Sequence, residues 1–526
     1  MTTLPSDASA NRYPDEGLPE GSVVDGETIT RPVDEIFDMV VVGSGAAGGV
    51  AAETLTRLGF SVGIVEEGPW LKTRDITVDV HTTFGRVMRQ KGMQLLMGRS
   101  VMPMLQGRCV GGSTFVNSAI AWRVPEDVID DWSDRFGLGD SLSMKGLEPH
   151  FDALEDDLGV REVDERVLGG NNKMFLDQCA KMGIEASRMR RYDRDCKGSS
   201  LCITGCPTGA KQGMNVTYVP WALRHGARIF TSCRVEHVEI AGGRAVAVKA
   251  RSESGKVVRV RARHAVIVAA STIQTPNVLR RSGIRTRALG RHFQAHPGIG
   301  MGGLFDRDVG MGFGATQGAE SIHFRKSDRF KLETIALPPD IVCARIPGMG
   351  HELSERLAQL SHVAMWVTQV RAEAEGTVGE GFGGADRVKY TLTPNDIRAS
   401  RKALALLARM LFESGAREVW PGIYGLPSVM RSIDEAKLIE DGPMEPRSYS
   451  YIATHLFGAA RMGPDPSVTV CDTDFMVHGT EGLYVVDSSV FPTNLGVNPQ
   501  HTIMAMSRLA ATRLAEGITK RRTVAA

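Results

Sequence analysis

The stretch FDMVVVGSGAAGGVAAETLTRLGFSVGIVEEG, residues 37–68, predicts a strand, a tight turn, a helix and a second strand. Residues 39–42 are apolar and mostly β-branched, as in a buried strand, and the Ala-rich segment after the turn has helical character. Between them, Gly43, Gly45 and Gly48 follow the spacing G-x-G-x-x-G. This order of elements is typical of a dinucleotide-binding α/β unit.

The three glycines have different physical roles in such a turn. Gly43 permits the tight turn, Gly45 lets the backbone approach a pyrophosphate at the helix N-terminus, and Gly48 lets the helix pack closely on the strand. Glu66 ends the second strand, where a carboxylate can bind the ribose hydroxyls of an adenosine. The unit therefore predicts a bound dinucleotide, but it does not distinguish NAD from FAD.

Composition and charge limit the other classes of function. The chain has 526 residues, 42% of them hydrophobic, so it can bury a large core, and we expect two domains or one domain with large insertions. Its 62 basic and 61 acidic residues are spread without long runs, so we expect no nucleic acid and no anionic membrane surface as partner. No segment predicts a membrane span, and the polar N-terminus does not resemble a signal peptide. We expect a cytoplasmic protein that binds a small molecule, while export with a partner subunit stays open.

Three further segments complete a recognisable pattern. GRCVGGSTFVN, residues 107–117, matches G-R-x-x-G-G-S-[ST]-x-x-N, and STIQTPNVLRRSGI, residues 271–284, matches S-x-x-x-T-P-x-x-L-x-x-S-G-I. LYVVDSSVFPT and NPQHTI lie near the C-terminus. Together with the glycine-rich turn, these segments resemble the glucose-methanol-choline (GMC) oxidoreductases, which are FAD enzymes that oxidise alcohols. The resemblance covers residues 38–515 in the family's order, and residues 300–450 match only in general character.

The resemblance implies an α/β fold with two domains. A Rossmann-like FAD-binding domain would comprise residues 35–138, 207–299 and 450–526. A second, α+β substrate-binding domain built on an antiparallel sheet would comprise residues 139–206 and 300–449. Residues 1–34 would form a polar N-terminal extension.

The resemblance also implies FAD and gives each segment a place along it. The ADP half would lie on the glycine-rich turn, and the flavin and ribityl chain on residues 107–117 and the C-terminal segment. Because Val116 stands where some family members carry a histidine linked to FAD, we expect non-covalent FAD. The cofactor-binding residues that we expect are Gly43, Gly45, Gly48, Glu66, Gly107, Gly111, Gly112, Ser113, Asn117, Val235, Asp487, Asn498 and Pro499.

Alcohol oxidation by a flavin requires a base, because the hydroxyl proton must leave as hydride moves to flavin N5. Histidine suits this role because its ordinary pKa of about 6.5 lies near working pH. The resemblance implies His455, in HLFG, as the base, and Asn498, in VNPQH, as the partner that orients the hydroxyl and stabilises the developing alkoxide. His501 is a second candidate for the partner's role, against a packing role at a helix start. For His296, in AHP, we favour a structural role.

Three of the eight cysteines fall within CKGSSLCITGC, residues 196–206. Structural zinc would need four ligands, and a disulfide would leave one thiol over. The spacing of Cys196, Cys202 and Cys206, followed by PTGAKQG, is similar to the segment that holds a 3Fe-4S cluster in the catalytic subunit of bacterial FAD-dependent glucose dehydrogenases. Two interpretations stay open, namely an iron–sulfur cluster on these three cysteines or a loop of packed thiols.

We therefore expect FAD-dependent oxidation of an alcohol CH–OH group to a carbonyl by hydride transfer to flavin N5. One alternative is a lyase of the same fold that keeps FAD oxidised, and another is an oxygen-using alcohol oxidase in place of a dehydrogenase. The sequence does not identify the electron acceptor, which could be oxygen, a quinone, a dye or a redox partner protein. Both long-chain or alicyclic alcohols and sugars fit as substrates.

Overall fold

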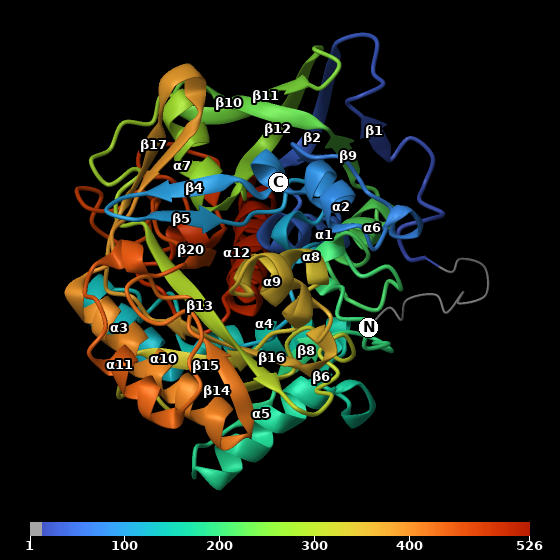
Figure 1. Ribbon diagram of the computed structural model, residues 1–526. Coiled ribbons are helices and arrows are strands. Elements are labelled where there is room, and N and C mark those ends of the chain that lie inside the picture. Colours follow the sequence, from blue (N-terminus) through green and yellow to red (C-terminus); the bar gives the residue numbers. More distant parts are fainter. Residues whose placement is uncertain (1–12, 526) are drawn as a thin grey trace.

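The computed structural model describes residues 13–525 and contains two large sheets (Figure 1). In the first sheet, β2, β3, β9 and β1 pair in parallel, β12 pairs in parallel with β2 and β21, and β10, β11 and β12 are antiparallel. The sheet order is β1 (Val23–Asp25), β9 (Arg228–Thr231), β3 (Val62–Val65), β2 (Val33–Val42), β12 (Val257–Val268), β11 (Arg244–Ser252) and β10 (Cys233–Ala241), with β21 (Leu483–Val485) also on β12.

The glycine-rich turn joins β2 to α1 (Ala46–Arg57), as predicted. Gly43 has φ +94°, and a Cβ there would lie 2.5 Å from the carbonyl oxygen of Ala269. A Cβ on Gly48 would lie 2.0 Å from the carbonyl oxygen of Gly43. Both positions therefore exclude any larger residue, and the close packing of helix on strand depends on them.

The second sheet is mainly antiparallel, with parallel pairing only between β4 and β18 and between β5 and β20 among the strands of residues 13–525. Its buried face packs on α10 (Pro394–Glu413), whose N-terminus is capped by the Thr393 side chain. The order is β17 (Thr377–Glu380), β18 (Asp386–Lys389), β4 (Gln94–Met97), β5 (Val101–Met104), β20 (Ile452–Phe457), β13 (Gln294–Phe305), β16 (Val363–Val370), β15 (Phe330–Thr334), β14 (Ala319–Ser321) and β7 (Ser187–Arg188), with β19 (Ala416–Trp420) on β13.

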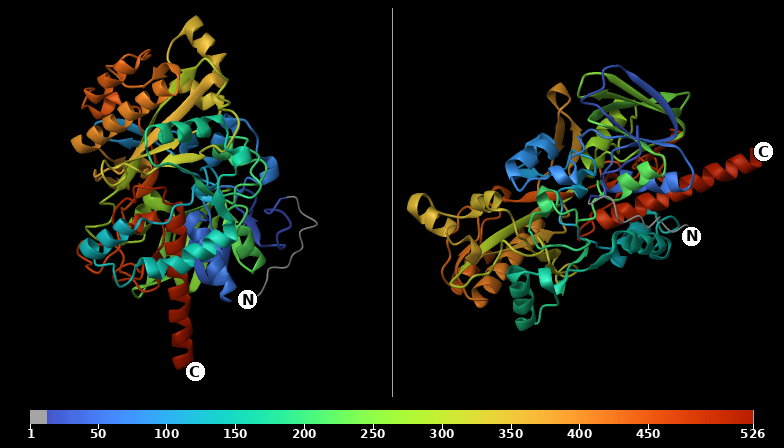
Figure 2. Two further views of the ribbon diagram at one scale, coloured as in Figure 1. Left: turned by 90° about the horizontal axis from the view of Figure 1, so that it is seen from below. Right: turned by 90° about the vertical axis from the view of Figure 1, so that its right-hand side faces the viewer.

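Helices and one small sheet complete the molecule. α12 (Gln500–Ala525) packs against α1 and α4, and its C-terminal end projects from the body (Figure 2). No helix of residues 13–525 is both long and apolar enough to cross a bilayer. The other elements are α2 (Val80–Val87), α3 (Glu126–Phe136), α4 (Met144–Leu158), α5 (Gly170–Lys181), α6 (Tyr218–Arg224), α7 (Ser271–Arg281), α8 (Pro339–Val342), α9 (Gly350–Leu357), α11 (Lys437–Glu440), and the pair β6 (Val160–Glu162) and β8 (Arg190–Tyr192).

The predicted domain bounds do not separate the strands of the two sheets. β4 and β5 lie within residues 35–138 and β20 within residues 450–526, yet all three join the second sheet. The N-terminal extension is also partly ordered, since β1 pairs with β9 on the first sheet, while residues 1–12 lie outside the described part of the chain. A site between the sheets can therefore draw residues from many parts of the sequence.

Candidate functional site

A cavity of about 800 Å³ lies between the two sheets and is lined by residues of both. At one end it is lined by the glycine-rich turn, by residues 107–117 and by the N-terminal turn of α7. At the other end it is lined by β13, β16, β20 and the segment around α8. We call these the glycine end and the apolar end.

The two glycine-rich loops meet at the glycine end. A Cβ on Gly112 would lie 3.0 Å from the Cα of Gly45, and the Ser44 hydroxyl accepts a hydrogen bond of 3.1 Å from the backbone N–H of Gly111. Beside Gly45 there is open space, because only the Cα of Gly112 lies within 4 Å of a Cβ built there. This space adjoins the N-terminus of α1, where free N–H groups favour a pyrophosphate.

Glu66 is buried at the end of β3 and lines the cavity. One carboxylate oxygen accepts hydrogen bonds from the backbone N–H and hydroxyl of Ser44, at 2.9 and 2.7 Å, and the other accepts one of 2.8 Å from the Gly68 N–H. Burial nevertheless raises the pKa of Glu66. Its position fits an acceptor for ribose hydroxyls, so the residues present fit a dinucleotide with its adenosine at this end.

Asp487 joins the C-terminal segment to α7. Its carboxylate accepts hydrogen bonds from the backbone N–H groups of Ser271 and Ser489, at 3.0 and 2.8 Å, and from the Thr275 hydroxyl at 2.5 Å. Burial raises the pKa of Asp487. Of the expected cofactor-binding residues, Gly48 and Gly111 support the loops from behind, and those that line the cavity are Gly43, Gly45, Glu66, Gly107, Gly112, Ser113, Asn117, Val235, Asp487, Asn498 and Pro499.

His455 and Asn498 face each other across the apolar end. His455 lies on β20 and Asn498 in the loop before α12, and His455 Nε2 is 3.4 Å from Asn498 Nδ2. His455 is half-buried and borders the cavity. Removal from water lowers the pKa of His455 to about 4, with a smaller contribution from Glu333 that opposes the shift and one from Lys331 that adds to it. The imidazole is therefore neutral at neutral pH and can accept a proton.

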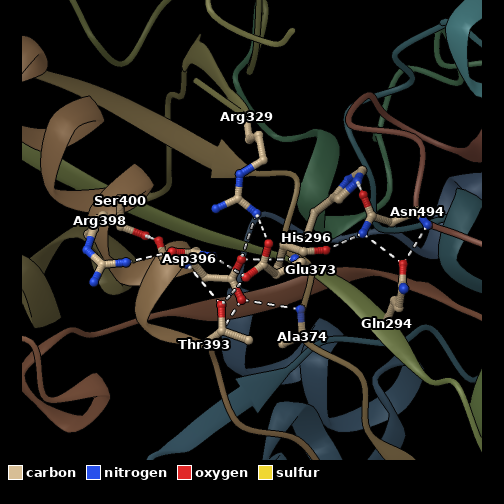
Figure 3. A network of polar contacts seen from close by, with 12 residues as sticks. Gln294, His296, Arg329, Glu373, Ala374, Thr393, Asp396, Arg398, Ser400 and Asn494 are labelled. Carbon is tan, nitrogen blue, oxygen red and sulfur yellow. Dashed lines mark hydrogen bonds and ion pairs between the residues drawn. The ribbon is translucent and has the colours of Figure 1, made fainter. Parts of the chain in front are cut away.

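His296, on β13, lies behind His455 and does not line the cavity. Its Nδ1 is 3.4 Å from His455 Nδ1, and its Nε2 is 3.1 Å from Asn494 Oδ1 and 2.9 Å from the backbone nitrogen of Gly496. Figure 3 shows His296 facing Asn494, which in turn faces Gln294. This placement supports a structural role, in which His296 supports both the His455 ring and the loop that carries Asn498.

A buried lysine behind Asn498 was not predicted from the sequence. Lys331, on β15, donates a hydrogen bond of 2.6 Å to Asn498 Oδ1 and forms ion pairs with Glu320 at 2.5 Å and with Glu333 at 2.6 Å. Burial opposes the charge of Lys331, but the two carboxylates raise its pKa. Because the ammonium donates to Oδ1, the amide NH₂ of Asn498 must turn toward His455 and the cavity.

His501 is not part of this site, contrary to our second candidate for the partner's role. It is fully buried in the first turn of α12 and does not line the cavity. Its Nε2 is 3.3 Å from a carboxylate oxygen of Glu155, and its ring packs on Phe151 with centroids 5.2 Å apart. The physical reason is helical direction, because the first turn of α12 presents this side chain to α4 and away from the cavity.

Of the two interpretations of the cysteine segment, the arrangement of side chains does not support the iron–sulfur cluster. Within residues 13–525 no group of three or more His, Cys, Asp or Glu side chains is arranged to hold a metal ion. The Cys202 sulfur accepts a hydrogen bond of 3.3 Å from Arg191, and the Cys206 sulfur one of 3.3 Å from the backbone N–H of Lys211. Although burial opposes ionisation of Cys202, the charges of Arg191 and Lys211 lower its pKa. The geometry is that of a loop of packed thiols.

Lys211 gives this cysteine segment a structural role. Its buried ammonium donates hydrogen bonds to the carbonyl oxygens of Phe115 at 2.5 Å, Asn117 at 2.9 Å and Cys202 at 2.8 Å. Burial lowers the pKa of Lys211 to about 8. Lys211 thus ties the cysteine segment to the loop of residues 107–117, which lines the glycine end.

The apolar end of the cavity suits an aliphatic ligand. Among the described residues that line this end of the cavity away from His455, Arg345 carries the only charged side chain. It donates a hydrogen bond of 3.1 Å to the Ser450 carbonyl. Two carboxamides, Gln317 and Gln369, donate to Glu333 at 2.9 and 3.0 Å. Apart from Thr454 on β20, the remaining side chains of the wall are apolar, with Ile299, Ile335, Leu337, Ile341, Met365 and Val367.

Comparison with known proteins gives consistent results. Two family profiles described as GMC oxidoreductase match residues 37–298 and 384–507. An uncharacterized GMC-type oxidoreductase of Mycobacterium tuberculosis is 35% identical over 95% of this chain and 78% of its own length. The long-chain-alcohol oxidase FAO1 of Arabidopsis thaliana is 29% identical over 92% of this chain and 67% of its own length.

The fold is shared with solved structures of low sequence identity. The crystal structure of pyridoxine 4-oxidase from Mesorbium loti aligns with a TM-score of 0.70 at 18% identity, covering 90% of this chain and 98% of its own. A formate oxidase of Aspergillus oryzae, studied for its FAD modification, aligns with a TM-score of 0.70 at 16% identity, covering 93% of this chain and 99% of its own.

Proposed function

The chain belongs to the glucose-methanol-choline oxidoreductase family, and from this premise we propose that it oxidises the CH–OH group of an apolar alcohol to a carbonyl with non-covalently bound FAD. The family profiles that match this chain are described as GMC oxidoreductase, which supports an oxidoreductase reaction. The observation that carries the proposal is the neutral His455 beside Asn498, on the wall of a cavity that continues from the glycine-rich cradle.

The chain's own residues have separate tasks in binding the cofactor. Gly45, Gly112 and the N-terminus of α1 would hold the pyrophosphate, and Glu66 the adenosine ribose. Asp487 and Asn117 would hold the part nearest His455. When bound, FAD supplies the acceptor for the hydride that leaves the alcohol carbon.

His455 and Asn498 would handle the hydroxyl group. His455 Nε2 accepts the hydroxyl proton, which requires the tautomer with its own proton on Nδ1, the atom facing His296. The amide NH₂ of Asn498 donates a hydrogen bond to the same oxygen and stabilises the negative charge that develops on it. Lys331 holds the amide in this orientation, and the apolar wall excludes water from the reacting carbon.

The lining of the cavity favours an aliphatic alcohol over a sugar. A sugar would need several hydrogen-bonding groups around its hydroxyls, whereas the apolar end offers mainly aliphatic side chains. The 29% identity with a long-chain-alcohol oxidase supports the same substrate class. We therefore propose a long-chain or alicyclic primary or secondary alcohol as the substrate.

Anaerobic mixing of the FAD-loaded protein with alcohols tests this function. We expect dodecanol to bleach the flavin absorbance, and glucose at equal concentration to bleach it at least about 100-fold more slowly, because glucose cannot replace its lost hydration in the apolar end. Admitting oxygen and measuring peroxide then shows whether oxygen is the electron acceptor. Flavin that stays oxidised with every alcohol, as in a lyase of this fold, would contradict the proposal.

A further inference from the structure

The hairpin of β4 and β5 presents an apolar face to solvent. Leu95 and Met97 on β4 are 42% and 48% exposed, and Val101 on β5 is 56% exposed. The hairpin of β4 and β5 is labelled in Figure 1. Its register pairs Leu95 with Pro103 and Met97 with Val101, so these four side chains form two cross-strand pairs on one face. Met93, just before β4, is 76% exposed.

The opposite face of the same hairpin is also apolar, apart from the buried Gln94. Leu96, Met102 and Met104 are buried in the core of the second sheet. A strand with one solvated face normally alternates between apolar and polar residues, and this hairpin does not. A contiguous exposed apolar face of this kind marks a binding surface.

Basic side chains surround the apolar face. Residues 80–125 contain no Asp or Glu and six Arg or Lys, of which Arg89, Arg99 and Arg123 form ion pairs with carboxylates of other segments. On the neighbouring strand β18, Lys389 pairs in register with Met97, and both Lys389 and Arg387 are exposed. Within the described chain no ion pair involves Arg86, Lys91, Arg387 or Lys389.

The acidic groups near this surface are already engaged. Glu380 pairs with Arg281, Asp386 accepts hydrogen bonds from Gln274 and Asn277, and Glu445 pairs with Arg99. The balanced total of 62 basic and 61 acidic residues therefore conceals a locally positive, apolar surface. A second copy of the chain meeting this face through its own identical face would bring like charges together, which disfavours a symmetric dimer here.

We propose that the β4–β5 face docks on an anionic lipid surface. Exposed aliphatic side chains ringed by lysine and arginine are what a peripheral lipid-binding surface requires, since the former enter the headgroup boundary and the latter attract anionic headgroups. The face is continuous with the cavity, because Pro103 lines both, and Leu105, Phe84 and Gly92 line the cavity beside it. If the proposed alcohol oxidation holds, an apolar substrate reaches the site directly from the lipid.

Vesicle sedimentation with the FAD-loaded full chain tests this docking. We expect binding to phosphatidylcholine vesicles that contain phosphatidylglycerol, at least about 10-fold tighter than to phosphatidylcholine alone and weakened by salt. Leu95→Ser with Met97→Ser should weaken binding to the anionic vesicles by about 10-fold or more, because two aliphatic contacts are lost. Lys91→Glu with Lys389→Glu should do the same through charge.

A matched control separates this face from general hydrophobicity. Val468→Ser with Leu438→Ser removes two aliphatic side chains of similar exposure, 48% and 45%, outside the hairpin and should leave vesicle binding unchanged. Flavin absorbance of each variant reports that it is folded. Vesicle binding is read independently of alcohol oxidation, so failure of the two proposals can be told apart.

Four outcomes would overturn the docking proposal, and the first three concern vesicle binding alone. These are no binding to anionic vesicles, equal binding with and without phosphatidylglycerol, and binding that the Leu95→Ser and Met97→Ser changes leave intact. A fourth is a shift of those variants from dimer to monomer on size-exclusion chromatography with unaltered vesicle binding, which would assign the face to a second copy of the chain.

Discussion

Two fully buried lysines, Lys211 and Lys331, support opposite ends of the same cavity and differ in their partners. Lys211 donates to three backbone carbonyl oxygens, and burial lowers its pKa to about 8. Lys331 donates to one amide oxygen and forms ion pairs with two carboxylates, which raise its pKa. A buried ammonium bound only by backbone carbonyl groups connects backbone segments, but the desolvation of its charge is not fully offset. A buried ammonium between carboxylates stays charged and can orient a neighbouring amide.

The two lysines should also respond to pH with opposite signs. Lys211 has a pKa of about 8 in the folded chain, below its unfolded value of 10.5. Between these two pH values the unfolded chain binds more protons than the folded chain does, so the free energy of unfolding rises with pH. Lys331 has a folded pKa above its unfolded value, so its contribution is present at lower pH and is lost as pH rises beyond the unfolded value.

Lys331→Met should have the largest effect. It leaves Glu320 and Glu333 buried without a cation and lowers the free energy of unfolding by about 3–5 kcal/mol. It also frees the Asn498 amide, so the rate of flavin reduction should fall by about 10²-fold. Urea unfolding and stopped-flow absorbance measure the two effects.

A compensated variant separates the two roles of Lys331. Adding Glu320→Gln and Glu333→Gln to Lys331→Met removes the unpaired charges, and should restore much of the stability but not the rate. If the single variant reduces flavin as fast as the wild type, Lys331 does not position Asn498.

Lys211→Met should act on cofactor binding and leave hydride transfer nearly unchanged. Three carbonyl oxygens lose their donor, which we expect to cost about 1–3 kcal/mol of stability and to weaken FAD binding through the loop of residues 107–117. FAD titration and the limiting rate of flavin reduction measure this. A large fall in the limiting rate at saturating FAD would remove the distinction between the two lysines.

The stability of Lys211→Met relative to the wild type should depend on pH. Because burial of the charged form is unfavourable below a pKa of about 8, the wild type should gain on the variant as pH rises from 8 toward 10.5. A constant difference across this range would show that Lys211 is not desolvated.

Cys196→Ser should have the smallest effect. Cys196 is half-buried and burial raises its pKa, so it is a poor thiolate ligand, and the substitution should change stability by less than about 1 kcal/mol. The iron content per protein, measured in anaerobically purified wild type and variant, tests whether Cys196 binds iron. Stoichiometric iron in the wild type that disappears in the variant would restore the iron–sulfur interpretation.

The sequence predicted the glycine end well because its requirements are local. Gly43, Gly48 and Glu66 act through one turn and one strand end, and each leaves a mark at fixed spacing. The family resemblance likewise predicted the pairing of His455 with Asn498, which the structure brings within 3.4 Å.

The sequence could not predict the parts that depend on packing between distant segments. In FKLET, residues 330–334, Lys331 and Glu333 alternate with Phe330 and Leu332, a pattern typical of a strand with one face in water. All five residues are buried, because β15 lies between β14 and β16 and the charges satisfy one another. The spacing of Cys196, Cys202 and Cys206 likewise does not say whether the sulfurs converge.

The most direct measurement is the pH dependence of flavin reduction in the wild type and in His455→Ala, by stopped-flow pH jump at saturating alcohol. A neutral base with a pKa of about 4 predicts a rate that is flat above about pH 5 and falls as pH drops through about 4. His455→Ala, with FAD still bound, should be slower by about 10²–10⁴-fold and lack this acid limb. Unchanged reduction in His455→Ala, or the same acid limb in both proteins, would contradict the assignment of His455 as the base.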